Sequence, residues 1–193
     1  MLRILLIDNY DSFTFNLVQL IKEAAIDTEL KIVSNNIHPD ELPYPFDKVL
    51  ISPGPGLPEE SGNLMQLISV LADKYPLFGV CLGHQAIAQH FGAQLKLMPK
   101  SFHGIRSNCH ILNDTDYLFN SLNRTNYCGR YHSWVIDEQS LPFNLVPTAS
   151  DEDGLIMAFR HKFLDIHAVQ FHPESYMTEN GLEMIQNWLS HVD

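Results

Sequence analysis

Basic residues are scarce in this sequence of 193 residues. It has 12 Lys and Arg against 23 Asp and Glu, which gives a formal net charge of −11 with the histidines neutral. A large nucleic-acid interface needs clustered Lys and Arg to neutralise phosphates, so we expect no nucleic-acid partner. Net charge reports on solubility rather than on fold, so the fold must be inferred from the pattern of residues.

Cysteine and long apolar runs are also scarce. The sequence has three cysteines, Cys81, Cys109 and Cys128. Such a small, odd number does not suggest a disulfide framework and is typical of a protein in a reducing compartment. No apolar run approaches the roughly 20 residues that a membrane-spanning helix needs. The opening residues, Met1 to Asp8, become acidic too soon for a signal peptide. We expect a cytoplasmic protein with no membrane partner.

Short apolar segments, by contrast, are abundant. Ile4–Ile7, Val49–Ile51 and Leu77–Val80 are continuous apolar runs, as in strands that are buried on both faces. Each is followed by apolar residues at helical spacing, which predicts parallel βαβ units in the first half of the chain. Further on, strand-like segments lie too close together for helices between them, until a closing helix at Glu179–Leu189.

The predicted fold class is α/β, with a mostly parallel central sheet flanked by helices and a smaller antiparallel extension in the C-terminal half. No internal repeat, low-complexity tract or linker divides the chain. A hydrophobic fraction of 45% over this length is enough to bury a substantial core without disulfides or metals. We predict a single domain over residues 1–193.

The residues around Cys81 have the pattern Gly-x-Cys-x-Gly, between a predicted buried strand and a predicted helix. Small flanking residues permit the strained strand-to-helix turn of a nucleophile elbow. The positive end of the helix dipole then favours the nucleophilic thiolate. A free cysteine is more often a small buried hydrophobe, which is our interpretation of Cys109 and Cys128. For Cys81 we predict a nucleophile.

A thiolate nucleophile needs a base and a group that orients the base. His172 follows a predicted strand, and Pro173 biases it toward an extended backbone. Residues two apart in an extended segment project to the same side, so Glu174 can reach the imidazole and fix its tautomer. We predict a catalytic triad of Cys81, His172 and Glu174, in which His172 assists thiolate formation and later protonates the leaving group.

A proline- and glycine-rich loop, Ser52 to Gly56, leaves the predicted strand that neighbours the strand of Cys81. Proline has no backbone N–H, so only glycines here can donate to a developing oxyanion. We predict an oxyanion site from Gly54, Pro55, Gly56 and Leu82, with the N–H groups of Gly56 and Leu82 as donors. A merely rigid loop is the alternative. The segment lacks the Lys and Ser/Thr of a phosphate-binding P-loop.

Five segments together resemble the class I (triad) glutamine amidotransferases, and specifically the glutaminase subunits of anthranilate synthase and aminodeoxychorismate synthase. They span nearly the whole chain and are Asn9–Thr14, Ser52–Gly56, Gly79–Gln85, Arg130–Ser133 and Gln170–Ser175. The resemblance implies that Cys81 attacks the side-chain amide of glutamine, releases ammonia and leaves a thioester that water hydrolyses. It also implies that Gln85, Ser133 and the backbone at Trp134 hold the substrate.

The same resemblance implies a synthase partner, a chorismate-binding component I that receives the ammonia, and no cofactor or metal in this chain. Ile105 stands where family members often have Lys, and Trp134 where they often have Leu. The pair Ser133-Trp134 and the segment Asn187–Leu189 favour anthranilate synthase, whereas Asn9–Asp11 is equally similar to the aminodeoxychorismate type. The prediction is the glutaminase subunit of anthranilate synthase, in tryptophan biosynthesis, and the alternative is the folate-pathway subunit.

Two other functions fit the sequence less well. A thiol hydrolase of the α/β-hydrolase type normally has its acid before the histidine in the chain, whereas Glu174 follows His172. A catalytically silent interaction subunit would have no need of all three triad residues. We also expect that the isolated chain is slow until the partner docks, because free glutaminase activity would waste glutamine.

Overall fold

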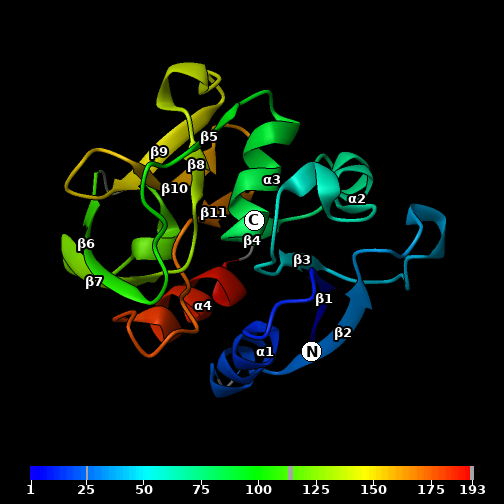
Figure 1. The fold of residues 1–193 in the computed structure, drawn as a ribbon. Helices are drawn as coiled ribbons and strands as arrows, with labels where there is room; N and C mark the ends of the chain where they lie inside the picture. Colours follow the sequence, from blue (N-terminus) through cyan, green and yellow to red (C-terminus); the bar gives the residue numbers. More distant parts are fainter. Residues whose placement is uncertain (25, 113–114, 192–193) are drawn as a thin grey trace.

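The computed structural model describes residues 1–24, 26–112 and 115–191. Within these residues, nine strands form the main sheet in the order β2-β1-β3-β4-β11-β10-β9-β6-β7, and β5 pairs with β8 in a small second sheet (Figure 1). The strands are β1 Leu2–Asp8, β2 Thr28–Ser34, β3 Lys48–Ile51, β4 Leu77–Val80, β5 Leu95–Leu97, β6 Ile105–Ile111, β7 Thr125–Arg130, β8 Trp134–Ile136, β9 Leu145–Ser150, β10 Ile156–His161 and β11 Ile166–Val169. The α-helices are α1 Thr14–Glu23, α2 Leu64–Leu71, α3 Leu82–His90 and α4 Gly181–Ser190.

The pairing of the strands confirms the predicted fold class. Strands β1, β2, β3, β4 and β11 pair in parallel, and β10, β9, β6 and β7 continue the sheet in antiparallel pairs. Strand β11, from the C-terminal half, joins the two parts of the sheet. It pairs in parallel with β4 on one side and antiparallel with β10 on the other. This position sets the segment that follows β11 beside the segment that follows β4.

Two apolar cores cover the two faces of the sheet. Along β1, Ile4 and Leu6 belong to a core shared with α1 and α4, while Leu5 and Ile7 belong to a core shared with α2 and α3. This alternation follows from the two-residue period of a strand. All four side chains are fully buried, and each contributes roughly 1.5–3 kcal/mol of hydrophobic stabilisation. Figure 1 shows α1 and α4 on one side of the sheet and α2 and α3 on the other.

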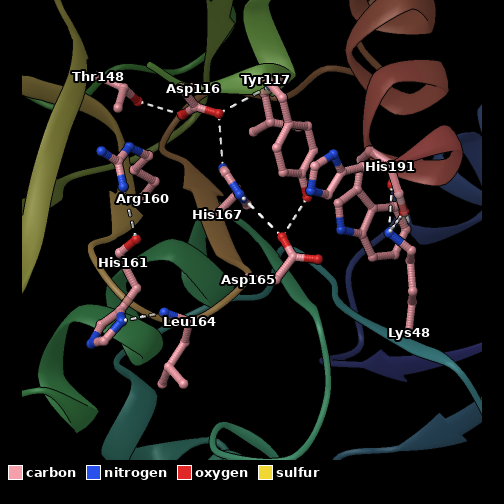
Figure 2. Close-up of polar contacts among 12 residues, drawn as sticks. Lys48, Asp116, Tyr117, Thr148, Arg160, His161, Leu164, Asp165, His167 and His191 are labelled. Carbon is pink, nitrogen blue, oxygen red and sulfur yellow. Dashed lines mark hydrogen bonds and ion pairs between the residues drawn. The ribbon is translucent and has the colours of Figure 1, made fainter. Parts of the chain in front are cut away.

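A buried polar network lies at the start of β11, at the opposite end of the strand from Cys81. The ring of His167 bonds to Asp116 Oδ1 at 2.8 Å and to Asp165 Oδ1 at 3.2 Å. The Thr148 hydroxyl donates a hydrogen bond to Asp116, and the Tyr117 hydroxyl donates one to Asp165 (Figure 2). Burial lowers the pKa of His167, but the hydrogen bonds and charges of the two aspartates outweigh it, so the pKa is raised. The network ties β11 to the segment before β7.

A buried lysine holds the C-terminal end of α4. Lys48, the first residue of β3, donates to the carbonyl oxygens of Trp188 and His191, each at 2.8 Å. Figure 2 shows this side chain running up to His191. A cation at a helix C-terminus pairs with its unsatisfied carbonyls and with the negative end of the helix dipole. Among the four α-helices of the described chain, none is long and apolar enough to cross a membrane.

Candidate active site

Three loops meet at one edge of the parallel sheet. The strands β3, β4 and β11 are adjacent and parallel, so their carboxyl ends lie side by side. The proline- and glycine-rich loop follows β3, Cys81 follows β4, and Gln170 to Glu174 follow β11. In α/β sheets, ligands bind at this edge. The structure thus brings together the segments that carry the predicted nucleophile, base and oxyanion donors.

Cys81 occupies a strained turn between β4 and α3. Its backbone has φ 53° and ψ −99°, and it is the residue that precedes the first turn of α3. The turn is possible because its neighbours are glycines: a Cβ on Gly79 would lie 2.7 Å from the Gly83 carbonyl, and a Cβ on Gly83 would lie 2.6 Å from the Ile51 oxygen. Strain of this kind persists where the surroundings enforce it, often at functional sites. The sulfur therefore lies at the positive end of α3.

His172 and Glu174 form a buried pair beside Cys81. The distance from His172 Nδ1 to Glu174 Oε1 is 2.7 Å, and neither side chain is more than 2% exposed. His172 Nε2 has no hydrogen-bond partner in the described part of the chain, so it is left for a reacting group. Burial lowers the pKa of His172, but the close approach of Cys81, and then the hydrogen bond and charge of Glu174, raise it well above its usual value. The raised pKa favours the imidazolium form of His172.

The predicted oxyanion loop packs directly on the elbow. A Cβ added to Gly54 would lie 2.5 Å from Leu82 Cδ2 and 2.5 Å from Asn9 Cβ, so only glycine fits between them. Gly56 has φ 73°, a left-handed conformation that glycine adopts without strain. Leu82 is the first residue of α3, so its N–H has no acceptor within the helix. Pro55 lines a separate hollow with Asn9 and Tyr10.

The predicted substrate-binding residues are engaged with other protein groups. Gln85 is 3% exposed, and its Nε2 donates to Trp134 O at 2.9 Å and to Gln170 Oε1 at 3.1 Å. Ser133 Oγ donates to Ser101 Oγ at 2.7 Å. The structure therefore brings Gln85 and the Trp134 carbonyl together, while Ser133 is bonded to a different loop. The side chain of Trp134 borders a groove of about 510 Å³.

One residue at the site was not singled out from the sequence. Gln170 is fully buried, and its Nε2 lies 3.7 Å from Cys81 Sγ. Its position two residues before His172 is the signal that could have identified it, since both then project from the end of β11. Within the described ranges, no three His, Cys, Asp or Glu side chains converge as a metal site would require.

The family pattern "Glutamine amidotransferase class-I" matches residues 5–192 of the chain. The chain belongs to this family. It is 44% identical over 188 residues to Bacillus subtilis "Aminodeoxychorismate/anthranilate synthase component 2", a match that covers 96% of this chain and 95% of that protein. It is 43% identical over 192 residues to Mycobacterium tuberculosis "Anthranilate synthase component 2", covering 98% and 82%.

A solved structure agrees with this assignment. The crystal structure of a Thermoplasma acidophilum protein, described as part of a GMP synthase, has a TM-score of 0.85 and 29% identity, covering 98% of this chain and 92% of that one. The chain is therefore an enzyme of the glutamine amidotransferase class, with the fold that its sequence predicts.

Proposed function

We propose that this protein is the glutaminase subunit of anthranilate synthase and that Cys81, His172 and Glu174 carry its chemistry. The observation that carries the proposal is the 2.7 Å contact between His172 and Glu174, with His172 Nε2 left without a hydrogen-bond partner among the described residues, beside a cysteine on a strained elbow. A base oriented by a carboxylate and facing a nucleophile is the arrangement that acyl transfer needs. The family description, "Glutamine amidotransferase class-I", supports glutamine as the substrate whose side-chain amide is split.

The reaction starts with the Cys81 thiolate attacking the side-chain amide carbon of glutamine. The carbonyl oxygen gains the negative charge and is held by the N–H groups of Leu82 and Gly56. The imidazolium of His172 gives its proton to the amide nitrogen, the C–N bond breaks, and ammonia departs. A γ-glutamyl thioester remains on Cys81. Neutral His172 then takes a proton from water, which attacks the thioester, and glutamate departs as the thiolate reforms.

Ammonia is then delivered to a synthase partner, a chorismate-binding component I. The relatives' names support this step, because both call the matching protein component 2 of a synthase. The name of the Bacillus subtilis relative joins anthranilate and aminodeoxychorismate synthase. The glutaminase subunit of aminodeoxychorismate synthase, in the folate pathway, is therefore the second candidate.

The test pairs the purified chain with its synthase partner, chorismate and glutamine. We expect Cys81→Ala to abolish glutamine-driven product, while added ammonium still supports product formation. Cys109→Ala is the matched control, because Cys109 is buried in β6 away from the elbow, and should retain glutamine-driven turnover. Glutamine-driven turnover by Cys81→Ala would refute the proposal. The identity of the product decides between anthranilate and aminodeoxychorismate.

A further inference from the structure

Gln170 is held beside the sulfur of Cys81 by backbone hydrogen bonds. Its N–H donates to the Met157 oxygen of β10 at 2.8 Å, and the preceding carbonyl, of Val169, accepts from the Cys81 N–H at 2.8 Å. The side chain is fully buried, and its Nε2 lies 3.7 Å from Cys81 Sγ. A donor fixed in this position is suited to a sulfur that carries negative charge.

The direction of the Gln170 amide is set by its neighbours. The carbonyl of Trp134 can only accept a hydrogen bond, so the Gln85 group that lies 2.9 Å from it must be the NH₂. That same NH₂ lies 3.1 Å from one of the two terminal atoms of the Gln170 amide. Because the NH₂ donates, this atom of Gln170 must be the oxygen, Oε1. The NH₂ of Gln170 is then the group that faces Cys81.

The Trp134 carbonyl that accepts from Gln85 also accepts from His132, which is itself bonded to a buried ion pair. Arg130 donates from Nη1 to Asp151 at 2.7 Å and from Nε to His132 Nε2 at 3.1 Å. Burial and the charge of Arg130 lower the pKa of His132 to about 3, so the ring is neutral. Because Arg130 can only donate, His132 accepts at Nε2 and carries its proton on Nδ1, which lies 3.1 Å from Trp134 O.

Resting on the proposed function, in which Cys81 reacts as a thiolate, we propose that Gln170 donates a hydrogen bond to that thiolate. Gln85 is the positioning residue that fixes the direction of the Gln170 amide, through its hydrogen bonds to the Trp134 carbonyl and to Gln170. The hydrogen bond stabilises the ionised sulfur without adding charge, so it acts together with the His172 imidazolium. The other titratable or charged groups packed around the site are Glu174 and Tyr131 against His172, the Arg130–Asp151 ion pair, and His132 and His84, whose lowered pKa values keep their rings neutral.

The experiment measures how fast iodoacetamide alkylates Cys81 as a function of pH, with the adduct located by peptide mass spectrometry. Gln170→Met keeps the size of the side chain and removes the donor. We expect it to raise the pH midpoint of alkylation by about one unit. Gln170→Glu adds a like charge beside the sulfur and should raise the midpoint further. Gln19→Met, on the exposed face of α1, is the matched control and should leave the midpoint unchanged.

Gln85→Met is the second variant, because it leaves Gln170 in place but frees its amide to turn. It should raise the midpoint by less than Gln170→Met. A wild-type midpoint in folded Gln170→Met would overturn the inference. If circular dichroism shows that Gln170→Met does not fold, a wild-type midpoint in Gln85→Met would do so.

The assay needs a reactive Cys81 but no glutaminase activity. Shifted midpoints in a protein that never hydrolyses glutamine would sink the proposed function and leave the hydrogen bond intact. Normal glutamine hydrolysis with unshifted midpoints would sink the hydrogen bond alone.

Discussion

At the scale of single residues, the orientation of His172 is fixed on several sides. Glu174 bonds to Nδ1 at 2.7 Å, and the rings of Phe13 and Tyr131 meet the imidazole edge-on, each at an interplanar angle of 66°. The ring has little freedom to tilt. Its Nε2, which has no hydrogen-bond partner in the described ranges, is therefore available for repeated proton transfer in one geometry, which is the role that Glu174 supports.

Replacing Glu174 by Gln tests this role. The amide is the same size but cannot stabilise an imidazolium, so we expect kcat/KM for glutamine to fall by roughly 10²-fold or more. Ammonium-dependent product formation by the complex should be unchanged. Glu183→Gln, at an exposed position of α4, is the control and should behave as wild type. Full glutamine-dependent activity in Glu174→Gln would mean that the carboxylate is not part of the catalytic unit.

His84, on the helix that begins at the elbow, ties stability to acid pH. It is fully buried, its ring nitrogens have no hydrogen-bond partner in the described residues, and burial lowers its pKa to about 3. The unfolded chain takes up this proton near pH 6.5, so the unfolded state binds more protons as pH falls. From this group alone, the free energy of unfolding should drop by about 2 kcal/mol between pH 7 and pH 5.

The variant His84→Leu removes this titration at nearly constant volume. The free energy of unfolding at pH 7 should change by less than about 1.5 kcal/mol. Its decrease between pH 7 and pH 5 should be smaller than in the wild type by about 2 kcal/mol. Urea unfolding at pH 7 and pH 5 measures both. Exposed His103→Leu is the control and should keep the wild-type difference between the two pH values. An undiminished acid loss in His84→Leu would show that this ring is not the source.

At the scale of elements, β11 organises the site. It lies between β4 and β10, its carboxyl end leads into Gln170 and His172, and its start is anchored by His167 between the carboxylates of Asp116 and Asp165. The strand is only four residues long. Its placement therefore depends on the anchor at one end as well as on pairing with its neighbours.

The variant His167→Leu leaves the buried Asp116 and the partly buried Asp165 without the His167 cation between them. We expect a loss of about 3 kcal/mol in the free energy of unfolding near pH 6, measured by urea titration. Because the pKa of His167 is raised on folding, its contribution is full below its ordinary pKa and is lost as pH rises through the raised value. The difference from wild type should accordingly narrow in alkaline buffer. The control is His110→Leu, at a half-buried position of β6, which should lower the free energy of unfolding by less than about 0.5 kcal/mol. An equal loss in both variants would refute the role of His167 in anchoring β11.

At the scale of the whole molecule, the sequence predicted those strands and helices that have a regular local pattern of apolar residues. The continuous apolar runs of β1, β3 and β4 and the helical spacing of α4 identified their elements, because a buried strand or helix face has a regular period. The polar strand β7 and the small β5–β8 sheet were not predicted. The contact between Gln170 and Cys81 was also missed, because it depends on which strand lies next to β4, and no local pattern records that.

The same scale includes the partner. The hydroxyl of Ser133, which was predicted to hold substrate, donates instead to Ser101 of this chain. We therefore expect the isolated chain to hydrolyse glutamine slowly, and docking of the synthase to raise the rate of glutamate release by about 10-fold or more, a shift of about 1.4 kcal/mol. Equal rates of glutamate release with and without the synthase would contradict this expectation.

The central claim, that the thiolate of Cys81 is the group that takes the acyl moiety of glutamine, is tested most directly by covalent labelling. The complex is incubated with a glutamine-like chloroketone, and labelling of each cysteine is followed by peptide mass spectrometry alongside glutamine-dependent activity. We expect label on Cys81 alone, in proportion to the activity lost, and protection by glutamine. Activity that survives complete labelling of Cys81, or loss of activity that follows labelling of Cys109 or Cys128 instead, would contradict the account.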